Sequence, residues 1–395
     1  MEKRIYLDHG ATSYTKKEVL DEMLPYFTEE HGNPSSVHSF GRYARKAIDK
    51  ARERIAKPLN AGFQEIFFTG SGTESDNWAI KGIALANEDK GKHIITSAIE
   101  HHAVLYTCEY LEKMGFEVTY LPVDSYGMVN PEDVRRAIRS DTILISIMFA
   151  NNEIGTIQPI KEIGKIAKES GIYFHTDAIQ AIGCVDIDVD DMNIDLLSLS
   201  AHKFYGPKGI GALYIRKGTK ISPLLHGGAQ ERNRRAGTEN TPGIIGMAKA
   251  MELAHENMEK NNEHLKQLRD KLIDGIMEKV DNVILNGHPD SRLPGNVNLS
   301  FEYIEGESLL LSLDLKGVAA SSGSACTSGS LDPSHVLLGI GLSHEIAHGS
   351  LRMTLSDNNT LEDIEYVLEV LPQIVDRLRD MSPLFVQEKG GSQYV

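Results

Sequence analysis

The sequence contains few cysteines, no long hydrophobic run and no recognisable export signal. Its three cysteines, Cys108, Cys184 and Cys326, are scattered through 395 residues. An odd number without CxxC spacing argues against a disulfide framework and against a structural zinc site. No run reaches the ~18 apolar residues that a membrane-spanning helix needs, and the first residues lack the apolar core of a secretory signal. We therefore expect a cytoplasmic protein that does not enter membranes.

Positive charge is also scarce. The 41 lysines and arginines are outnumbered by 56 aspartates and glutamates, so the formal net charge is −15. Non-specific nucleic-acid binding depends on clustered basic residues, so this balance argues against direct contact with nucleic acid. The hydrophobic fraction of 41% and the charged fraction of 25% are ordinary for a globular chain. With about 150 residues per domain, the length suits two or three domains, or one large α/β domain with an appendage.

Between about residues 60 and 215, short β-branched or aromatic runs alternate with helical stretches. This alternation predicts βαβ units and a mainly parallel sheet. Ligands of such sheets bind at the carboxyl ends of the strands, so chemistry is expected in the turns after the strands. The expected strands are residues 65–69, 94–97, 143–149, 172–175, 195–200 and 211–215, and the expected helices are 75–87, 103–114, 131–139 and 160–170.

After Pro242 the pattern changes. Residues 243–280 lack proline and carry leucine and isoleucine at spacings of three and four, which predicts one long helix leading to a second domain. Residues 283–285 and 296–301 resemble strands, and a last helix begins near Thr360. We expect Pro372 to kink or end that helix. The polar tail 389–395 is expected to fray or to depend on a partner.

Lys203 is the first candidate for chemistry. It lies in the polar segment 200–209, directly after a predicted strand. A lysine at that position can form a Schiff base with a carbonyl cofactor; a solvated lysine in a Gly/Pro turn is the alternative. Asp177 and Gln180 also follow a predicted strand. Asp177 can pair with a protonated pyridine nitrogen or N-cap a following helix, and Gln180 can donate to the phenolic oxygen of the same ring.

Two further segments fit the same kind of ligand. The Gly/Ser/Thr turn 70–73 joins a predicted strand to a predicted helix, and backbone N–H groups at a helix start suit a phosphate. The turn lacks the Gly-Lys-Ser/Thr of a nucleotide-binding loop. His101 and His102 are adjacent, so their side chains point apart and a shared metal is disfavoured. One histidine stacked on an aromatic cofactor, acting as an acid or base, fits better.

Cys326 lies in a segment of very small residues, 321–330, that cannot build a core. We expect this segment to form a mobile loop that carries an exposed, working thiol. Cys108 lies in an apolar helical stretch and Cys184 follows a glycine. Both are expected to be buried as small hydrophobic residues.

Taken together, these segments resemble the cysteine desulfurases of the NifS/IscS type, in the class V branch of the pyridoxal-phosphate enzymes. The resemblance covers nearly the whole chain, and its segments occur in order. They are Tyr6-Leu7-Asp8, Gly32-Asn33-Pro34-Ser35-Ser36, Thr73-Glu74-Ser75, Glu100-His101-His102-Ala103-Val104, Asn151-Asn152-Glu153-Ile154-Gly155, His175-Thr176-Asp177-Ala178-Ile179-Gln180, Ser200-Ala201-His202-Lys203, Arg235-Ala236-Gly237-Thr238, Ser322-Gly323-Ser324-Ala325-Cys326 and Leu351-Arg352-Met353-Thr354.

The resemblance implies fold type I of the pyridoxal-phosphate enzymes, an α/β fold. A large domain, residues 14–257, would hold a mainly parallel seven-stranded sheet. A smaller α+β domain, residues 1–13 and 258–395, would carry the Cys326 loop. The resemblance also implies a homodimer with pyridoxal 5′-phosphate as cofactor. The residues that it implies for cofactor binding are Gly72, Thr73, His101, Asn152, Asp177, Gln180, Ser200, His202 and Lys203, with Thr238 reaching in from the second subunit.

The resemblance further implies a reaction. Lys203 would hold the cofactor as a Schiff base and then act as a base, and His101 would stack on the ring and shuttle protons. The carboxylate of L-cysteine would be bound by Asn33, Asn152 and Arg352, because arginine donates two parallel hydrogen bonds. The Cys326 thiolate would take the substrate sulfur as a persulfide and release L-alanine.

The sulfur would then pass to an acceptor for iron–sulfur cluster assembly or tRNA thiolation. No resident metal is implied, although Cys326 could transiently ligate an iron–sulfur cluster held by a scaffold protein. The chain departs from the family pattern at His9-Gly10, at Gly70-Ser71-Gly72 and at Ser356-Asp357-Asn358-Asn359. A selenocysteine lyase or an aminotransferase of the same fold is the alternative enzyme, and a non-catalytic sulfur-trafficking scaffold is the alternative from another class. Cys326 distinguishes the cysteine desulfurase from these alternative enzymes, because only sulfur transfer from cysteine depends on it.

Overall fold

The structure is a computed structural model that describes residues 4–322, 333–383 and 385. Its centre is a seven-stranded sheet with the strand order β2-β8-β7-β6-β5-β3-β4. Strand β8 is antiparallel to both of its neighbours, and all other neighbouring pairs are parallel. The expected mainly parallel sheet is confirmed. The strands are β2 Ile66–Thr69, β3 His93–Ser97, β4 Glu117–Leu121, β5 Thr142–Ser146, β6 Tyr173–Asp177, β7 Leu196–Ser200 and β8 Gly211–Ile215.

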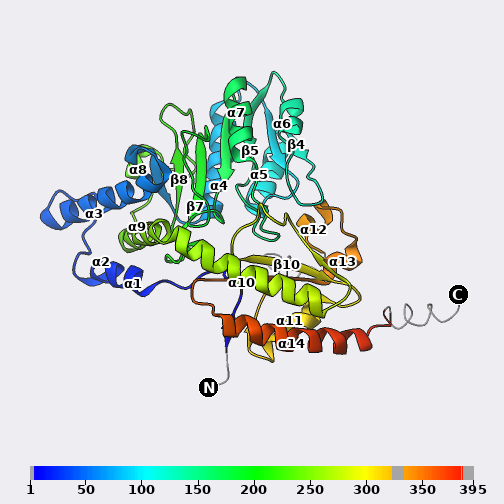
Figure 1. The fold of residues 1–395 in the computed structure, drawn as a ribbon. Helices are drawn as coiled ribbons and strands as arrows, with labels where there is room; N and C mark the ends of the chain where they lie inside the picture. The colour runs from blue at the N-terminus through cyan, green and yellow to red at the C-terminus, as the bar shows by residue number, and fades with distance from the viewer. Residues whose placement is uncertain (1–3, 323–332, 384, 386–395) are drawn as a thin grey trace.

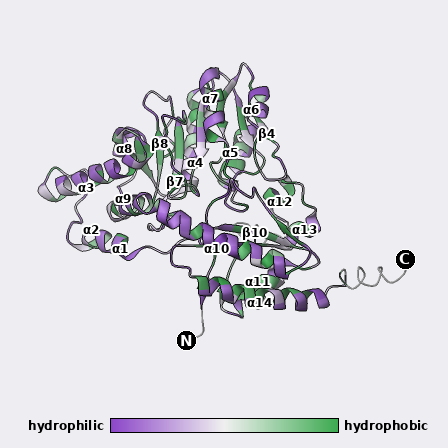
Figure 2. Ribbon diagram, viewed as in Figure 1, coloured by the Kyte–Doolittle hydropathy of each residue, from purple (hydrophilic) through white to green (hydrophobic). Residues whose placement is uncertain are grey.

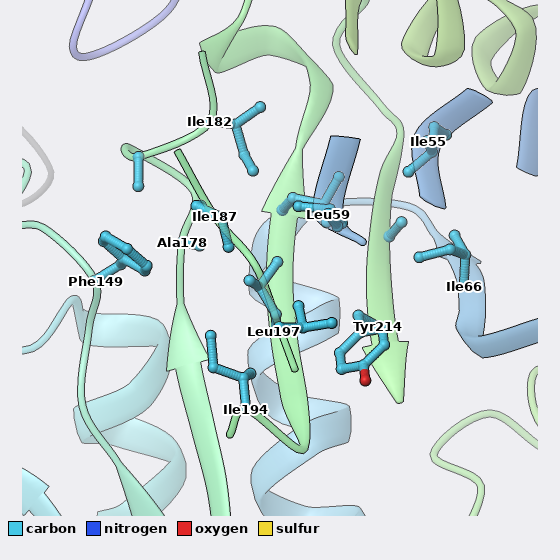
Figure 3. Packing of buried hydrophobic residues seen from close by; sticks show 14 of the residues in the cluster. Ile55, Leu59, Ile66, Phe149, Ala178, Ile182, Ile187, Ile194, Leu197 and Tyr214 are labelled. Atoms are coloured by element: carbon cyan, nitrogen blue, oxygen red, sulfur yellow. The ribbon is translucent and has the colours of Figure 1, made fainter. Parts of the chain in front are cut away.

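Apolar side chains cover both faces of this sheet, because successive residues of a strand point to opposite sides. Ile66 and Phe68 belong to one hydrophobic cluster, whereas Phe67 between them belongs to another. Figure 3 shows part of the first cluster, in which Leu59, Leu197 and Tyr214 lie near one another. Helices α3, α6, α7 and α9 contribute to this first cluster, and helices α4 and α5 contribute to the second.

The helices around the sheet follow the expected order. The helices of the first half are α1 Lys17–Met23, α2 Pro25–Thr28, α3 Ser39–Ala56, α4 Gly72–Ala86, α5 His102–Lys113, α6 Pro131–Ala137 and α7 Ile160–Ser170. Strand β4 was not expected from the sequence. It lies at the edge of the sheet and is only partly buried, so its apolar pattern is weak.

A second group of elements packs below the large sheet in Figure 1. An antiparallel sheet of order β12-β10-β9 joins Ser350–Thr354, Asn296–Phe301 and Val283–Leu285. The strands expected at 283–285 and 296–301 are thereby confirmed. Strand β1, Ile5–Tyr6, pairs with β11, Val318–Ala319, in a parallel ladder. Ile5 and Leu7 share one hydrophobic cluster with residues between 265 and 375. The domain boundaries at residues 13/14 and 257/258 stay a prediction.

The remaining helices lie mostly around this smaller sheet. They are α8 Gln230–Asn233, α9 Thr241–Glu256, α10 Met258–Lys279, α11 Gly306–Asp314, α12 His335–Gly339, α13 His344–His348 and α14 Leu361–Asp380. Helices α10 and α14 pack against each other, and both carry alternating hydrophilic and hydrophobic residues (Figure 2). The expected single helix over 243–280 is wrong, because the chain breaks at Asn257. The Asn257 side chain donates to the Leu253 carbonyl, 2.8 Å away, and thereby closes α9.

The expectation that Pro372 ends the last helix is wrong, whereas a kink at Pro372 stays a prediction. Helix α14 begins after its N-cap Thr360 and continues through Pro372 to Asp380. Proline has no N–H group, so the Leu368 carbonyl one turn earlier loses its helical partner. Lys279 supplies a replacement, because its Nζ donates to the Leu368 carbonyl oxygen at 3.1 Å.

Two other expectations concern the cysteines and the membrane. Cys108 is fully buried, as expected, whereas Cys184 is only half-buried. Cys326 with residues 323–332, and the tail 389–395, lie outside the described residues. None of the helices in the described part of the chain is both long and apolar enough to cross a membrane.

Candidate active site

The candidate site lies where several strands of the large sheet end. Strands β2, β3, β5, β6 and β7 run in one direction, so their carboxyl ends meet at the same edge of the sheet. Lys203 closes the short 3₁₀ helix Ala201–Lys203 that directly follows β7. Its Nζ donates to the carbonyl oxygens of Gly10, at 2.5 Å, and Ala11, at 2.8 Å. The N-terminal segment therefore crosses the end of the sheet and holds this amine.

Asp177 is the last residue of β6, and only 6% of it is exposed. Burial raises the pKa of its carboxyl to about 6, and the charge of Lys203 opposes that rise. The Ile179 N–H donates to Asp177 Oδ1 at 2.9 Å. The residues that follow form turns rather than a helix, so the N-cap alternative for Asp177 is wrong. A buried carboxylate near an amine is the arrangement expected of a partner for a cationic ring nitrogen.

Segment 10–13 links several of the predicted site residues. Gln180 Nε2 donates to the Gly10 carbonyl oxygen at 2.9 Å, which is also one of the Lys203 acceptors. His202 Nδ1 lies 3.1 Å from the Thr12 hydroxyl. Gly10, in turn, donates through its N–H to Thr354 Oγ1 at 2.6 Å. The sequence had not assigned this segment a role in the site.

Gly72 begins helix α4 in a place that has no room for a side chain. A Cβ there would lie 2.1 Å from Ile179 Cδ1 and 3.3 Å from Ser200 Cβ. Ser71 caps the helix by accepting a hydrogen bond from the Glu74 N–H at 3.1 Å. The N-terminus of α4 therefore approaches the ends of β6 and β7 closely, with Thr73 exposed beside it. Such a helix start favours an anion.

Two histidines beside Lys203 are held in the neutral form. Burial and the charge of Lys203 lower the pKa of His101 to about 4, and the same two causes lower the pKa of His202 to about 4. His101 N-caps α5, and its Nδ1 accepts the Ala103 N–H at 3.1 Å. At neutral pH each imidazole can accept a proton, as an acid–base group needs.

Arg352 lies on β12 and is almost completely buried. Its guanidinium donates to Asp8 Oδ1 at 3.0 Å and to the Asn152 carbonyl oxygen at 3.2 Å. Its Nε is buried and has no hydrogen-bond partner among the described residues. Asn152 also lines a cavity of about 90 Å³ together with Lys203, Gln180 and Thr354. This side of the site therefore presents a cation with a spare donor near the Lys203 amine.

Three predicted residues are not joined to this cluster by a recorded contact. Asn33 lies in the exposed segment before α3, and its Oδ1 accepts the Ser35 N–H at 2.9 Å. Thr238 is exposed after α8. Cys326 lies outside the described residues. Their roles stay predictions.

The residues of the cluster fit pyridoxal phosphate by their chemistry. Lys203 offers an amine, Asp177 a buried carboxylate and Gln180 an amide, and the neutral ring of His101 adjoins them. Gly72 lets the start of α4, where a phosphate is favoured, lie directly against Ile179 and Ser200. Sequence reasoning missed Asp8, Gly10 and Thr354 as parts of the site, although Asp8 and Thr354 stand inside segments that it singled out.

Comparisons with known proteins show the family to which the chain belongs. The model of the Aminotransferase class-V family matches residues 5–367. A cysteine desulfurase IscS from Methanosarcina thermophila is 66% identical over 386 residues, which cover 98% of this chain and 95% of that protein. A cysteine desulfurase IscS from Clostridium botulinum is 65% identical and covers 98% of both chains.

Solved structures show the same likeness. A NifS-like protein superposes with a TM-score of 0.90 at 41% identity, over 95% of this chain and all of that chain. The structure of SspA in complex with cysteine superposes with a TM-score of 0.80 at 42% identity, over 90% of this chain and all of that chain. The fold is fold type I of the pyridoxal-phosphate enzymes, and proteins of this group depend on that cofactor. This chain therefore belongs to the class-V aminotransferase family.

Proposed function

We propose that this protein is a cysteine desulfurase that converts L-cysteine to L-alanine and transfers the sulfur to Cys326. The observation that carries the proposal is the convergence of a lysine amine, a buried carboxylate and a neutral histidine at one edge of the sheet, beside Arg352. The relatives named cysteine desulfurase, at 65–66% identity over nearly the full length, support the choice of reaction.

The cofactor would be held by residues from five strand ends. The start of α4 with Gly72, Thr73, Ser200 and His202 would bind the phosphate, and Lys203 would bind the cofactor carbonyl carbon. Asp177 would face the ring nitrogen, Gln180 the phenolic oxygen, and His101 the ring face, with Asn152 at its edge. When bound, pyridoxal phosphate supplies an electron sink that stabilises the negative charge left on the substrate after its α-proton is removed.

Arg352 would bind the substrate carboxylate. Its guanidinium is fixed by Asp8 and by the Asn152 carbonyl, and its buried Nε has a donor to spare. A carboxylate accepts hydrogen bonds from an arginine fork at two oxygens, which orients the substrate as well as binding it. Asn33 and Asn152 are the further polar contacts that we assign to the substrate.

Two groups would move protons. Lys203 can act as the base once its amine is released, because Lys203 lines the same cavity as Asn152. His101 is neutral at physiological pH because its pKa is lowered to about 4. Its imidazole can therefore accept the thiol proton of the substrate.

The sulfur transfer itself would be carried out by Cys326. Its thiolate attacks the substrate sulfur, and a sulfur–sulfur bond forms while the carbon–sulfur bond breaks. The electron pair of the broken bond stays on the carbon fragment, which takes up a proton and leaves as L-alanine. Cys326 then holds a persulfide, which another thiol can accept.

We also assign a homodimer. Leu24, Phe27, Val37, Phe40 and Tyr43 of the α1–α3 region are each at least half exposed, and α3 projects away from the rest of the molecule in Figure 1. Clustered exposed apolar side chains are typical of a protein interface. A second subunit packed there would bring its exposed Thr238 to the phosphate. The sulfur acceptor would be an iron–sulfur scaffold or a tRNA-thiolation protein, and the enzyme would act in the cytoplasm.

The experiment is the release of alanine and sulfide from L-cysteine with a reductant, measured for the wild type, Cys326→Ala and Cys184→Ala. We expect equal amounts of both products from the wild type, their loss in Cys326→Ala and nearly full activity in Cys184→Ala. Cys184 is the matched control because it is the partly exposed one of the two cysteines that the structure describes.

Three outcomes would contradict the proposal. Activity that survives Cys326→Ala would point to a selenocysteine lyase or an aminotransferase. Failure of borohydride to fix the cofactor to Lys203 would remove the basis of the site. A stable complex with an acceptor but no turnover of free L-cysteine would favour the non-catalytic scaffold.

A further inference from the structure

Asp76 is a buried carboxyl group for which the proposed reaction has no use. It lies on α4 and packs against the strands of the large sheet, and none of it is exposed. Neither carboxyl oxygen has a hydrogen-bond partner in the described part of the chain. The nearest basic atom recorded is His175 Nε2, at 3.7 Å from Oδ1. An ionised carboxylate without partners in such a place would cost several kcal/mol.

His175 does not supply the missing positive charge. Its Nδ1 lies 2.9 Å from Ser146 Oγ and its Nε2 lies 3.0 Å from Ser198 Oγ. A hydroxyl can donate or accept, so both ring nitrogens of a neutral imidazole are satisfied in either tautomer. Complete burial lowers the pKa of His175 to about 3. This histidine is therefore a neutral neighbour of Asp76 and not an ion-pair partner.

The other charged groups that act on Asp76 are acidic. Burial is the largest cause that raises the pKa of Asp76, and Asp177 at the end of β6 and Glu100 before α5 raise it further, while the Ser198 hydroxyl acts against the rise. Glu100 is also buried, and burial raises its pKa to about 8 although Ser97 and the Met148 N–H donate to it. The surroundings of Asp76 thus contain no cation that would favour its ionised form.

Asp177 has the opposite environment although it lies close by. It accepts the Ile179 N–H at 2.9 Å, and the charge of Lys203 favours its ionised form. When two carboxyl groups interact in a buried place, they share one proton, and the better-solvated group keeps the charge. Here the hydrogen bond from the Ile179 N–H and the charge of the Lys203 amine both favour the ionised form of Asp177.

We propose that Asp76 is a positioning residue that carries a proton behind Asp177, so that the single negative charge of this pair lies on Asp177. Only the use of this charge rests on the proposed function, in which the ionised Asp177 faces a cationic ring nitrogen. The charge assignment itself stands on the burial, the missing partners and the neutral His175. Asp76 would act through Asp177 and would touch neither substrate nor cofactor.

The test compares Asp76→Asn with the wild type by infrared spectroscopy of the purified holoenzyme near pH 7. An amide has the shape of a protonated carboxyl and carries no charge. We expect Asp76→Asn to lose the carbonyl stretch of one protonated carboxylic acid. The matched control is Asp188→Asn, because Asp188 accepts the N–H groups of Asp190 and Asp191, both at 2.9 Å, and its pKa is lowered. That control should lose only a carboxylate band.

A second readout reports the effect on Asp177. The midpoint of the pH titration of the visible cofactor band should stay within a few tenths of a pH unit in Asp76→Asn, because one neutral group replaces another. If Asp76 is ionised, removing its charge shifts that midpoint by roughly one unit, and no protonated-acid band disappears. Either result overturns the proposal.

A third readout guards against a purely structural effect. The wild type must release the Asp76 proton on unfolding, so its stability falls as pH rises, whereas the variant has no such proton. The thermal midpoint of Asp76→Asn minus that of the wild type should therefore grow from about pH 5 to about pH 8, and a constant difference would contradict the proposal. If Asp76→Asn does not fold, Asp76→Ser gives the same readouts. None of them requires turnover of L-cysteine, so they can fail or succeed independently of the desulfurase assignment.

Discussion

Arg352 and Asp8 form an ion pair of 3.0 Å across 344 positions of the sequence. The guanidinium is almost completely buried, whereas Asp8 is partly exposed. Because Asp8 belongs to the segment that also holds Lys203 through Gly10 and Ala11, one stretch of chain orients both the cation assigned to the substrate carboxylate and the amine.

This pair predicts the behaviour of Arg352→Lys. A lysine keeps the charge but lacks the planar fork, so it cannot hold Asp8 and a carboxylate with parallel hydrogen bonds. We expect KM for L-cysteine to rise by about tenfold or more, since one charge-assisted hydrogen bond contributes about 1.5–3 kcal/mol. Steady-state kinetics check this. Arg379→Lys is the control, because Arg379 is also buried but donates to the Glu302 and Asn282 carbonyls far from the site. An unchanged KM in Arg352→Lys would contradict the assignment.

The close approach at Gly72 predicts the effect of Gly72→Ala. The new Cβ would meet Ile179 Cδ1 at 2.1 Å, so α4 or Ile179 has to move. We expect a loss of roughly 1–3 kcal/mol in the free energy of unfolding and less cofactor bound per subunit after dialysis. The double variant Gly72→Ala/Ile179→Val removes the clashing methyl group and should recover much of both losses. If the double variant is no better than Gly72→Ala, the clash is not the cause.

Glu153 predicts a pH dependence of stability. Burial raises the pKa of its carboxyl from 4.5 to about 7, against opposing effects of Ser334 and Arg352. The folded protein therefore binds a proton that the unfolded chain lacks, and this contribution to stability is lost as pH rises from about 4.5 to about 7. Glu153→Gln lacks that proton. Its thermal midpoint relative to the wild type should rise across this window and level off above it, and a difference that stays constant with pH would contradict the prediction.

The buried ion pair between Glu231 and Arg52 predicts a large loss in the free energy of unfolding for Glu231→Ala. Glu231 and Arg52 form a buried bidentate pair with distances of 2.7 and 2.8 Å, and Glu231 also accepts the Phe68 N–H of edge strand β2 at 3.0 Å. Removing one partner leaves a buried charge uncompensated, which costs about 3–5 kcal/mol. Urea unfolding should show this loss. Glu132→Ala breaks an exposed pair with Arg135 and should cost less than about 1 kcal/mol; equal losses would contradict the prediction.

The large sheet and the positions of Lys203, Asp177 and His101 follow from the sequence because strongly apolar strands precede them and polar turns follow. Strand β4 does not follow, since an edge strand needs no continuous apolar run. At Pro372 in α14, the Leu368 carbonyl that loses its helical partner accepts a hydrogen bond from Lys279, which is far away in the sequence. The local sequence pattern around Pro372 cannot reveal a contact with so distant a residue. The pairing of Arg352 with Asp8 and the isolation of Asp76 arise from tertiary packing, and no periodicity reveals them.

The pairing of β1 with β11 has a consequence for synthesis of the chain. Ile5 lies opposite Val318, so the first strand leaves the ribosome more than three hundred residues before its partner does. The large sheet, which ends at Ile215, can be completed during that delay. The N-terminal segment that holds Lys203 then docks beside it only when β11 and β12 have emerged. A nascent chain stopped before residue 318 should therefore have the strand ends of the site in place, while its N-terminal segment is not yet docked over them.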